Sequence, residues 1–338
     1  MVIVRRLLAT TGRSLLPLWL LTFTLCLFCI LGVAQPVLAQ ERLAPNPFTK
    51  GGQSAWFHDQ GDASGFFHTY DALAVGDQPH KVHVFVPRDY ETSQARYPVI
   101  YVNDGDTTFF RGGAINESWF LASVLGDLYQ SGQMQQVIVV AIYPRDRSYE
   151  YTHTNIGDTP GGGIEQYANY VANGVKRFID DNYRTQADAD HTLILGASHG
   201  GLAAYLMGML QPTAFGNVAA FSPSFWVGLD SDPISLIFSR SMESSELIQL
   251  SEPTLNQPSR HPQIYMDWGL IRDGQFHNDF IEARTTVRGR ELRDLLTRQY
   301  NYRLNQDLFV LEDGQGEHSE LSWRRRVPAV LKLFFGTI

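Results

Sequence analysis

Residues 191–210 read HTLILGASHGGLAAYLMGML, and this stretch decides the fold. A buried-strand pattern ends at Gly196, a serine stands between small residues at position 198, and a helical pattern begins at Gly200. In this setting the motif Gly-x-Ser-x-Gly predicts a nucleophile elbow, a sharp turn that lifts the serine hydroxyl above the carboxyl end of a sheet. The alternative is a structural serine that caps the helix.

Strands and helices alternate on both sides of this turn. Apolar runs without polar alternation lie at 97–106, 134–144, 217–223, 262–269 and the start of 307–320, and helical patterns lie at 162–183, 278–300 and 322–334. This order predicts an α/β protein with a doubly wound, mostly parallel sheet and helices on both faces. Strands at 67–74 and 80–87 are expected to add an antiparallel edge. Residues 228–260 interrupt this alternation of strands and helices and are expected to form an insertion or cap.

The first 39 residues have the plan of a secretory signal. Their only charges are three arginines, an apolar run covers 15–33, and small residues precede Gln40. We therefore expect an exported protein, periplasmic or extracellular. The alternative is a retained N-terminal membrane anchor, because the apolar run is nearly long enough to span a bilayer.

The rest of the chain is expected to be one domain. We predict a signal peptide at 1–39, a flexible lead-in at 40–65 that is rich in turn-forming and polar residues, and a folded domain at 66–338. Both cysteines, Cys26 and Cys29, lie in the signal segment, so no disulfide is expected in the exported chain. Its net charge falls from −8 to −11 without the three arginines, which argues against a nucleic-acid partner.

A serine hydroxyl needs a base, and in this chain order the base is a histidine on the loop after the last strand. His318 lies there and is the predicted general base. An acid is expected between the serine and the histidine, after the strand at 262–267. Asp273 is favoured because a loop carboxylate reaches above the sheet more easily, and Asp267 at the strand end is the alternative acid.

Two backbone amides are predicted to form an oxyanion hole. One is the N–H of His199, directly after the serine. The other is the N–H of Asp106, in the loop after the strand at 98–103, where Gly105 is expected to allow a substrate carbonyl to approach closely. The alternative for this loop is an ordinary Asp-Gly turn. No metal-ligating motif is present in the sequence, so no metal site is predicted.

The chain resembles the esterase D/enterochelin-esterase-like family of the α/β-hydrolase superfamily over about residues 66–336. The resemblance is carried by five segments in order: YPVIYVNDGD (97–106), RSYEYTHT (147–154), FIDDNYRTQADADHTLILGASHGGLAA (178–204), FSPSFW (221–226) and GEHSELSW (316–323). It implies the α/β-hydrolase fold, Ser198 as nucleophile, His318 as base, and the Asp106 and His199 amides as oxyanion donors. The family places its acid three residues after the glycine of the strand-end segment, where this chain has Arg272, with Asp273 one residue later.

Together these features predict a secreted serine esterase that works through an acyl-enzyme on Ser198 and needs no cofactor. The expected substrate is a small-molecule ester or an ester linked to a polysaccharide, and a membrane would be a partner only if the N-terminal segment is retained. Two alternatives stay open. One is an acyltransferase of the same fold, and the other is a non-catalytic ligand- or carbohydrate-binding protein on a hydrolase scaffold.

Overall fold

The computed structural model describes residues 46–76, 78–113, 116–230, 240–257, 259 and 261–337, which belong to one compact unit. The predicted signal peptide at 1–39 lies outside the described residues. Within the described part of the chain, no helix combines the length and the apolar character that crossing a bilayer requires.

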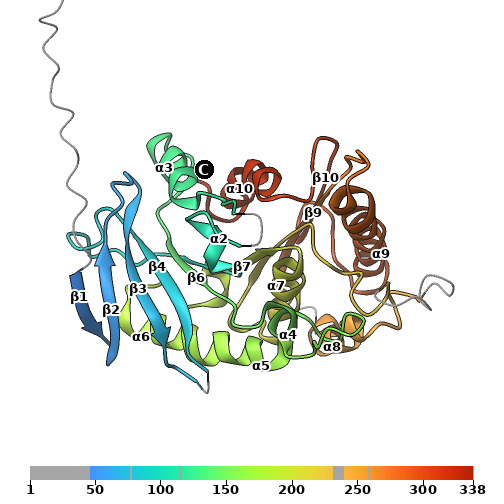
Figure 1. Cartoon of the computed structure of the whole chain (residues 1–338), viewed down its shortest axis with the longest axis horizontal. Helices are drawn as coiled ribbons and strands as arrows, with labels where there is room; N and C mark the ends of the chain where they lie inside the picture. The colour runs from blue at the N-terminus through green and yellow to red at the C-terminus, as the bar shows by residue number, and fades with distance from the viewer. Residues whose placement is uncertain are drawn as a thin grey trace, which may run out of the picture. The chain divides into compact units, whose positions relative to one another are not determined.

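The described residues form one ten-stranded sheet (Figure 1). Its order is β1-β2-β3-β4-β6-β5-β7-β8-β9-β10, with antiparallel pairs from β1 to β6 and parallel pairs from β6 to β10. The strands are β1 Asn46–Lys50, β2 Gln53–His58, β3 Gly65–Leu73, β4 His80–Pro87, β5 Val99–Val102, β6 Ile138–Ile142, β7 Thr192–Ala197, β8 Asn217–Phe221, β9 Gln263–Gly269 and β10 Leu308–Asp313. The predicted mostly parallel sheet with an antiparallel edge is confirmed.

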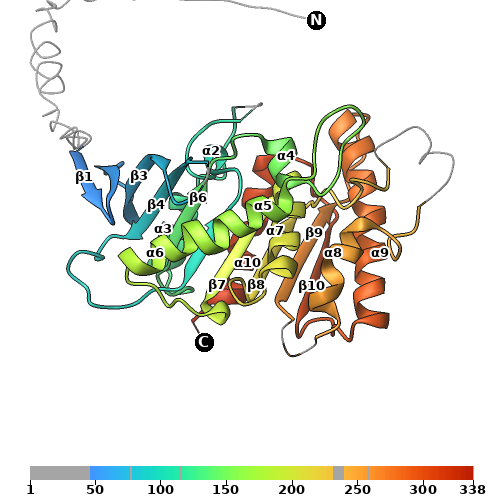
Figure 2. The same cartoon turned by 90° about the horizontal axis from the view of Figure 1, so that it is seen from below.

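Helices cover both faces of the sheet. They are α2 Gly105–Thr108, α3 Leu121–Gln130, α4 Arg147–Tyr151, α5 Ile164–Asn169, α6 Arg177–Asn182, α7 His199–Leu210, α8 Glu246–Leu255, α9 Ala283–Gln299 and α10 Glu320–Phe335. Two π-helical segments, η1 Tyr170–Lys176 and η4 His277–Glu282, and a short 3₁₀ turn, η2 Ala189–His191, complete the described helical elements. Figure 1 shows α3 and α10 on one side of the sheet and α5 and α6 on the other, and Figure 2 shows α5 and α6 crossing the strands.

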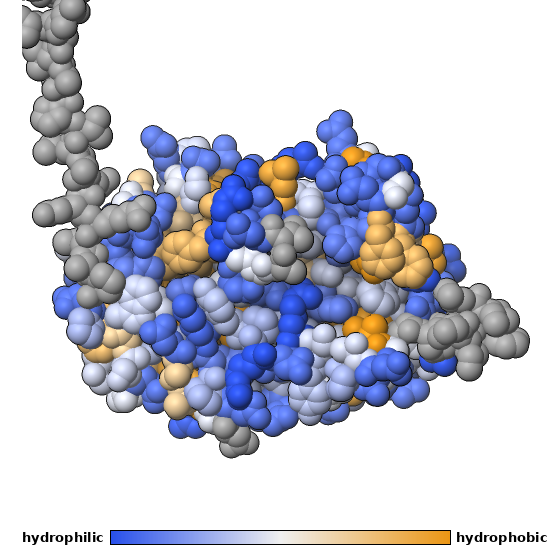
Figure 3. Space-filling model, viewed as in Figure 1, coloured by the Kyte–Doolittle hydropathy of each residue, from blue (hydrophilic) through white to orange (hydrophobic). Residues whose placement is uncertain are grey.

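The central strands are buried on both faces, and this explains why their sequences lack polar alternation. In β5, Val99 and Tyr101 face the core under α5 to α9, whereas Ile100 and Val102 face the core under α3 and α10. Successive side chains of a strand point to opposite faces, so a strand covered on both sides is apolar throughout. The outer surface is mainly polar in the view of Figure 3.

Two predictions about less regular segments are corrected. The expected flexible lead-in at 40–65 contains β1 and β2, which extend the antiparallel edge of the sheet. These strands are short and partly exposed, so their composition is polar and resembles a loop. The described part of the predicted cap at 228–260 contains α8, whose Leu247, Ile248 and Leu255 are buried in the core beside α7. That segment therefore covers a face of the sheet.

Candidate active site

Ser198 occupies a strained turn between β7 and α7. Its φ of 57° and ψ of −122° lie outside the regions that non-glycine residues usually adopt. The flanking glycines leave room for this turn, because a Cβ on Gly196 would lie 2.3 Å from the carbonyl oxygen of Gly200. The Ser198 N–H donates to the carbonyl oxygen of Phe221 on β8 at 2.9 Å, which ties the turn to the neighbouring strand.

His318 lies against this serine. It stands on the loop between β10 and α10, and its Nε2 is 3.0 Å from Ser198 Oγ. Two further contacts hold His318 in place: its backbone N–H donates to Asn278 Oδ1 at 3.0 Å, and the ring of Trp323 packs edge-on against the imidazole at a centroid distance of 5.1 Å. The two side chains that sequence reasoning paired are therefore within hydrogen-bond distance.

The carboxylate that contacts His318 is Glu282, and not either of the predicted acids. Glu282 Oε2 lies 2.6 Å from His318 Nδ1, and the Glu282 side chain is fully buried at the end of η4. Burial alone would raise the pKa of this carboxyl, but hydrogen bonds from His318, Gly269 and Ser222 bring it below its usual value. Glu282 is therefore ionised at neutral pH and accepts a hydrogen bond from Nδ1–H, which leaves Nε2 free to accept one from Ser198.

Asp273, the favoured acid, is exposed and makes a turn. Its carboxylate accepts hydrogen bonds from the Gln275 backbone N–H at 3.1 Å and from Asn278 Nδ2 at 3.2 Å. It approaches His318 only through Asn278, whose Oδ1 holds the histidine backbone. The correction has a simple physical reason: a carboxylate satisfied by its own turn is not available to an imidazole.

Asp267, the alternative acid, is buried below the site. Its Oδ2 pairs with Arg326 Nε at 2.9 Å and accepts a hydrogen bond from the Tyr265 hydroxyl at 2.8 Å, and its Oδ1 accepts one from the Ser222 N–H at 3.0 Å. Burial raises the pKa of Asp267 to about 6, against the opposing effect of Arg326. The carboxylate at the strand end thus neutralises an arginine and does not contact His318 itself.

Ser222 connects this buried pair to Glu282. Its Oγ donates to Glu282 Oε1 at 2.8 Å and accepts hydrogen bonds from Trp323 Nε1 at 3.0 Å and from Arg326 at 3.1 Å. Because both nitrogen groups can only donate, the hydroxyl proton of Ser222 points to Glu282. Ser222 is completely buried and has a positive φ of 40°.

We expect Asp267→Asn to lower the free energy of unfolding by about 3–5 kcal/mol, because it leaves the buried Arg326 guanidinium without its main counter-charge. Urea unfolding well above pH 6, where Asp267 is ionised, measures this loss. Asp313→Asn is the matched control, since Asp313 is a more distant partner of Arg326 at 3.4 Å and is partly exposed. Equal effects of the two substitutions would contradict this interpretation.

The predicted oxyanion donors stand at the beginnings of two helices. His199 is the first residue of α7 and Asp106 the second of α2, positions where the amide N–H has no carbonyl partner within its own helix. Gly105 also has a packing role that the sequence did not indicate. A Cβ there would lie 2.7 Å from the Ile142 backbone, so the glycine lets α2 pack against the end of β6. The oxyanion hole itself stays a prediction.

Arg147 is a site residue that sequence reasoning left without a role. It forms a two-pronged ion pair with Asp104, with Nε–Oδ1 at 2.7 Å and Nη2–Oδ2 at 2.8 Å. Its Nη1 lies 3.3 Å from His199 Nδ1, so the guanidinium contacts that imidazole. Burial lowers the pKa of His199 to about 3, with Arg147 adding to the effect, so His199 is neutral at ordinary pH. The sequence feature that could have indicated a role for Arg147 is the RSYEYT segment, which begins at this residue.

Comparison with known proteins agrees with this architecture. A solved structure of an IroE-like serine hydrolase from Shewanella oneidensis aligns with a TM-score of 0.58 and 19% identity over 80% of each chain. The enterobactin esterase FES of Shigella flexneri, solved with 2,3-dihydroxy-N-benzoyl-glycine, aligns with a TM-score of 0.51 and 16% identity over 79% of this chain and 58% of its own. These likenesses show that the chain has the α/β-hydrolase fold.

The family follows from the sequence. The family model described as "Putative esterase" matches residues 74–334, so the chain belongs to that family. Among curated proteins, the uncharacterized protein YbbA of Bacillus subtilis is 26% identical over 149 residues, which cover 42% of this chain. The chain matches 56% of the length of that relative.

Proposed function

We propose that the protein hydrolyses a small-molecule carboxylic ester through an acyl-enzyme on Ser198. The observation that supports this proposal is the continuous series of contacts from Ser198 Oγ to His318 Nε2 at 3.0 Å and from His318 Nδ1 to Glu282 Oε2 at 2.6 Å. A nucleophile, a base and a group that orients the base are the parts that acyl transfer to serine requires.

The proposed reaction has two halves. Ser198 Oγ attacks the ester carbonyl carbon while His318 Nε2 takes the hydroxyl proton, and Glu282 stabilises the imidazolium that forms. His318 then gives that proton to the departing alcohol oxygen, which leaves the acyl group on Ser198. Water attacks the acyl-enzyme while His318 takes a proton from it, and His318 then returns the proton to Ser198 Oγ as the carboxylic acid departs. The amides of His199 and Asp106 would donate to the oxyanion in both tetrahedral intermediates.

Hydrolysis of p-nitrophenyl acetate by the full chain tests the proposed function. We expect release of p-nitrophenolate with a rate that depends on Ser198. The rate should fall on acidification, because protonation of Glu282 removes the charge that orients the base. The acid limb of the pH–rate profile then reports the loss of that charge. A pH-independent rate equal to that in buffer would contradict the proposal.

Ser222 offers a separate prediction. Removing its hydroxyl deprives the Glu282 carboxylate of a hydrogen bond of ~1.5–3 kcal/mol, so kcat is expected to fall roughly 10- to 100-fold. The acid limb should also move to higher pH, because the Ser222 hydrogen bond lowers the pKa of Glu282. Both kinetic constants and the pH profile would be measured for Ser222→Ala and Ser222→Gly.

The glycine variant is the matched control for backbone strain. Glycine adopts the positive φ of 40° at this position without cost and lacks the hydroxyl just as alanine does. Similar losses of kcat in both variants, with KM little changed, would identify the hydroxyl as the cause. Wild-type activity in Ser222→Gly would show that the hydroxyl has no part in positioning Glu282.

Export of the protein, inferred from residues 1–39, remains a prediction.

A further inference from the structure

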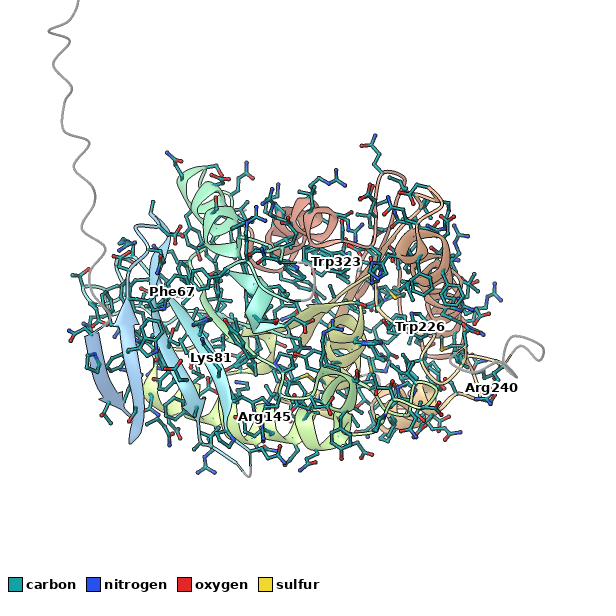
Figure 4. All side chains as sticks on the ribbon, in the orientation of Figure 1. Phe67, Lys81, Arg145, Trp226, Arg240 and Trp323 are labelled. Carbon is teal, nitrogen blue, oxygen red and sulfur yellow. The ribbon has the colours of Figure 1, made fainter. Side chains whose placement is uncertain are left out.

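A cleft is present whose lining does not include the serine. It has a volume of about 540 Å³ and is lined by residues of the turn between β3 and β4, of the segment leading into α4 and α4 itself, and of α5 and η1. Ser198, Glu282 and His318 are not among its lining residues. In Figure 4, Arg145 of this cleft is labelled near α5, apart from Trp226 and Trp323, which pack against His199 and His318.

The floor of the cleft is polar and held in place. His80 Nε2 lies 3.0 Å from Glu150 Oε1, and both side chains are largely buried. The second ring nitrogen of His80 faces the Gln78 carbonyl oxygen at 2.9 Å, and Glu150 Oε2 accepts the Arg145 backbone N–H at 3.0 Å. The ring of Tyr170 packs against His80 in a tilted arrangement, at a centroid distance of 4.5 Å. These contacts preorganise the floor without any ligand.

The wall of the cleft presents amide groups. Gln166, Asn169 and Asn173 are exposed and follow one another at helical spacing along α5 and η1, so their side chains share one face. Asn173 Nδ2 donates to Asn169 Oδ1 at 2.7 Å, which leaves the Asn169 amide hydrogens and the Asn173 carbonyl available to a ligand. The aromatic ring of Tyr149, 40% exposed, also lines the cleft.

Part of this wall is π-helical. Tyr170, Asn173 and Gly174 line the cleft from η1. Short π-helical segments often occur at functional sites. A second π-helical segment in the described part of the chain, η4, carries Glu282 of the candidate active site.

The lining selects a neutral ligand with many hydroxyl groups. Arg145 stands among the two carboxylates Asp146 and Glu150, and Glu150 is paired with His80, so no large net charge attracts an ion. Amide side chains both donate and accept, as hydroxyl groups do, and an exposed aromatic ring can cover an apolar C–H face. An extended peptide is disfavoured, because β3 and β4 are each paired on both sides and leave no sheet edge to extend.

We propose that this cleft is a second binding site and that it takes a neutral oligosaccharide. The amides of Gln166, Asn169 and Asn173 hydrogen-bond the sugar hydroxyls, and the Tyr149 ring packs against a sugar face. The volume is within the range of sites that enclose small organic ligands. This proposal does not depend on the ester chemistry at Ser198.

Isothermal titration of the full chain with xylotriose, cellotriose and triacetylchitotriose tests the proposal. We expect at least one of these neutral trisaccharides to bind, and the double variant Gln166→Leu/Asn173→Leu to bind it at least roughly tenfold more weakly. Both positions are exposed, so the substitutions leave the core intact. Gln249→Leu, an exposed amide on α8 outside the cleft, is the matched control and should bind as the wild type does.

Two further measurements separate this site from the ester site. The double variant should hydrolyse p-nitrophenyl acetate at the wild-type rate, and Ser198→Ala should bind the trisaccharide with unchanged affinity. The proposal is overturned if none of the three sugars binds at millimolar concentration, or if the double variant binds as tightly as the wild type. Binding of trialanine in place of the sugars, lost in the double variant, would equally overturn it in favour of a peptide.

Discussion

Ser198→Ala is expected to reduce kcat for p-nitrophenyl acetate by about 10⁶-fold, the scale seen when a serine nucleophile is removed from an enzyme of this type. The proposed mechanism runs through a covalent bond to Ser198 Oγ, and the neighbouring Ser224 cannot replace it. Ser224 Oγ lies 3.4 Å from Ser198 Oγ, and the imidazole contact of 3.0 Å belongs to Ser198. Binding should persist, so KM or the affinity for a product should change little.

The control for this variant is its fold. Alanine at position 198 keeps the backbone N–H that donates to Phe221, and it must adopt the same positive φ as the serine. Circular dichroism and the urea midpoint should therefore match the wild type closely. A folded Ser198→Ala protein with the wild-type rate would mean that ester hydrolysis occurs elsewhere in the chain.

Glu282→Gln is expected to reduce kcat by about 10⁴-fold, the scale known for an amide in place of a triad carboxylate. Glutamine keeps the shape of the side chain but can present its NH₂ group to His318. The imidazole then carries its proton on Nε2, the nitrogen that must accept the proton of Ser198. The variant also loses the charge that stabilises the imidazolium. The pH–rate profile and kcat of the variant would be compared with those of the wild type.

Asp273→Asn is the control that separates the two carboxylates. Asp273 is exposed and reaches His318 only through Asn278. Its replacement should change kcat by less than about tenfold, because it weakens only a few hydrogen bonds at a solvent-exposed turn. The opposite ranking, with Asp273→Asn inactive and Glu282→Gln near wild type, would restore the acid favoured by the sequence.

The proximity of Ser198 and His318 could be predicted because it depends on local chain chemistry. The elbow needs small residues around the serine, since a Cβ on Gly196 or Gly200 would meet backbone or the Asp104 carboxylate within 3 Å. The histidine loop follows the strand that pairs beside β9, at the same end of a parallel sheet. Order along the chain and sheet direction then bring the two side chains together.

Glu282 could not be found in this way. A glutamate inside a polar helical pattern is typical of a solvent-exposed position, and its burial depends on how η4 and α9 pack against β9. That packing is close: a Cβ on Gly289 of α9 would lie 2.4 Å from the Trp268 ring. Hydrogen bonds from Ser222 and the Gly269 N–H then stabilise the buried carboxylate. No pattern in the sequence contains these tertiary contacts.

The edge strands β1 and β2 were missed for a different reason. Strand propensity mainly reflects burial and cross-strand packing, and both are weak at an exposed edge. Residues such as Asn46, Pro47 and Gln53 therefore look like a loop, although their backbones complete the hydrogen-bonding of the sheet.

The central claim, that Ser198 forms a covalent intermediate, is tested most directly by mass spectrometry after reaction with a fluorophosphonate ester. A serine activated by His318 displaces fluoride and retains the phosphonyl group. We expect one added phosphonyl group, located on the peptide that contains Ser198 and absent from Ser198→Ala, together with loss of p-nitrophenyl acetate hydrolysis. Full hydrolytic activity with Ser198 unmodified, or a single modified residue elsewhere in the chain, would contradict the claim.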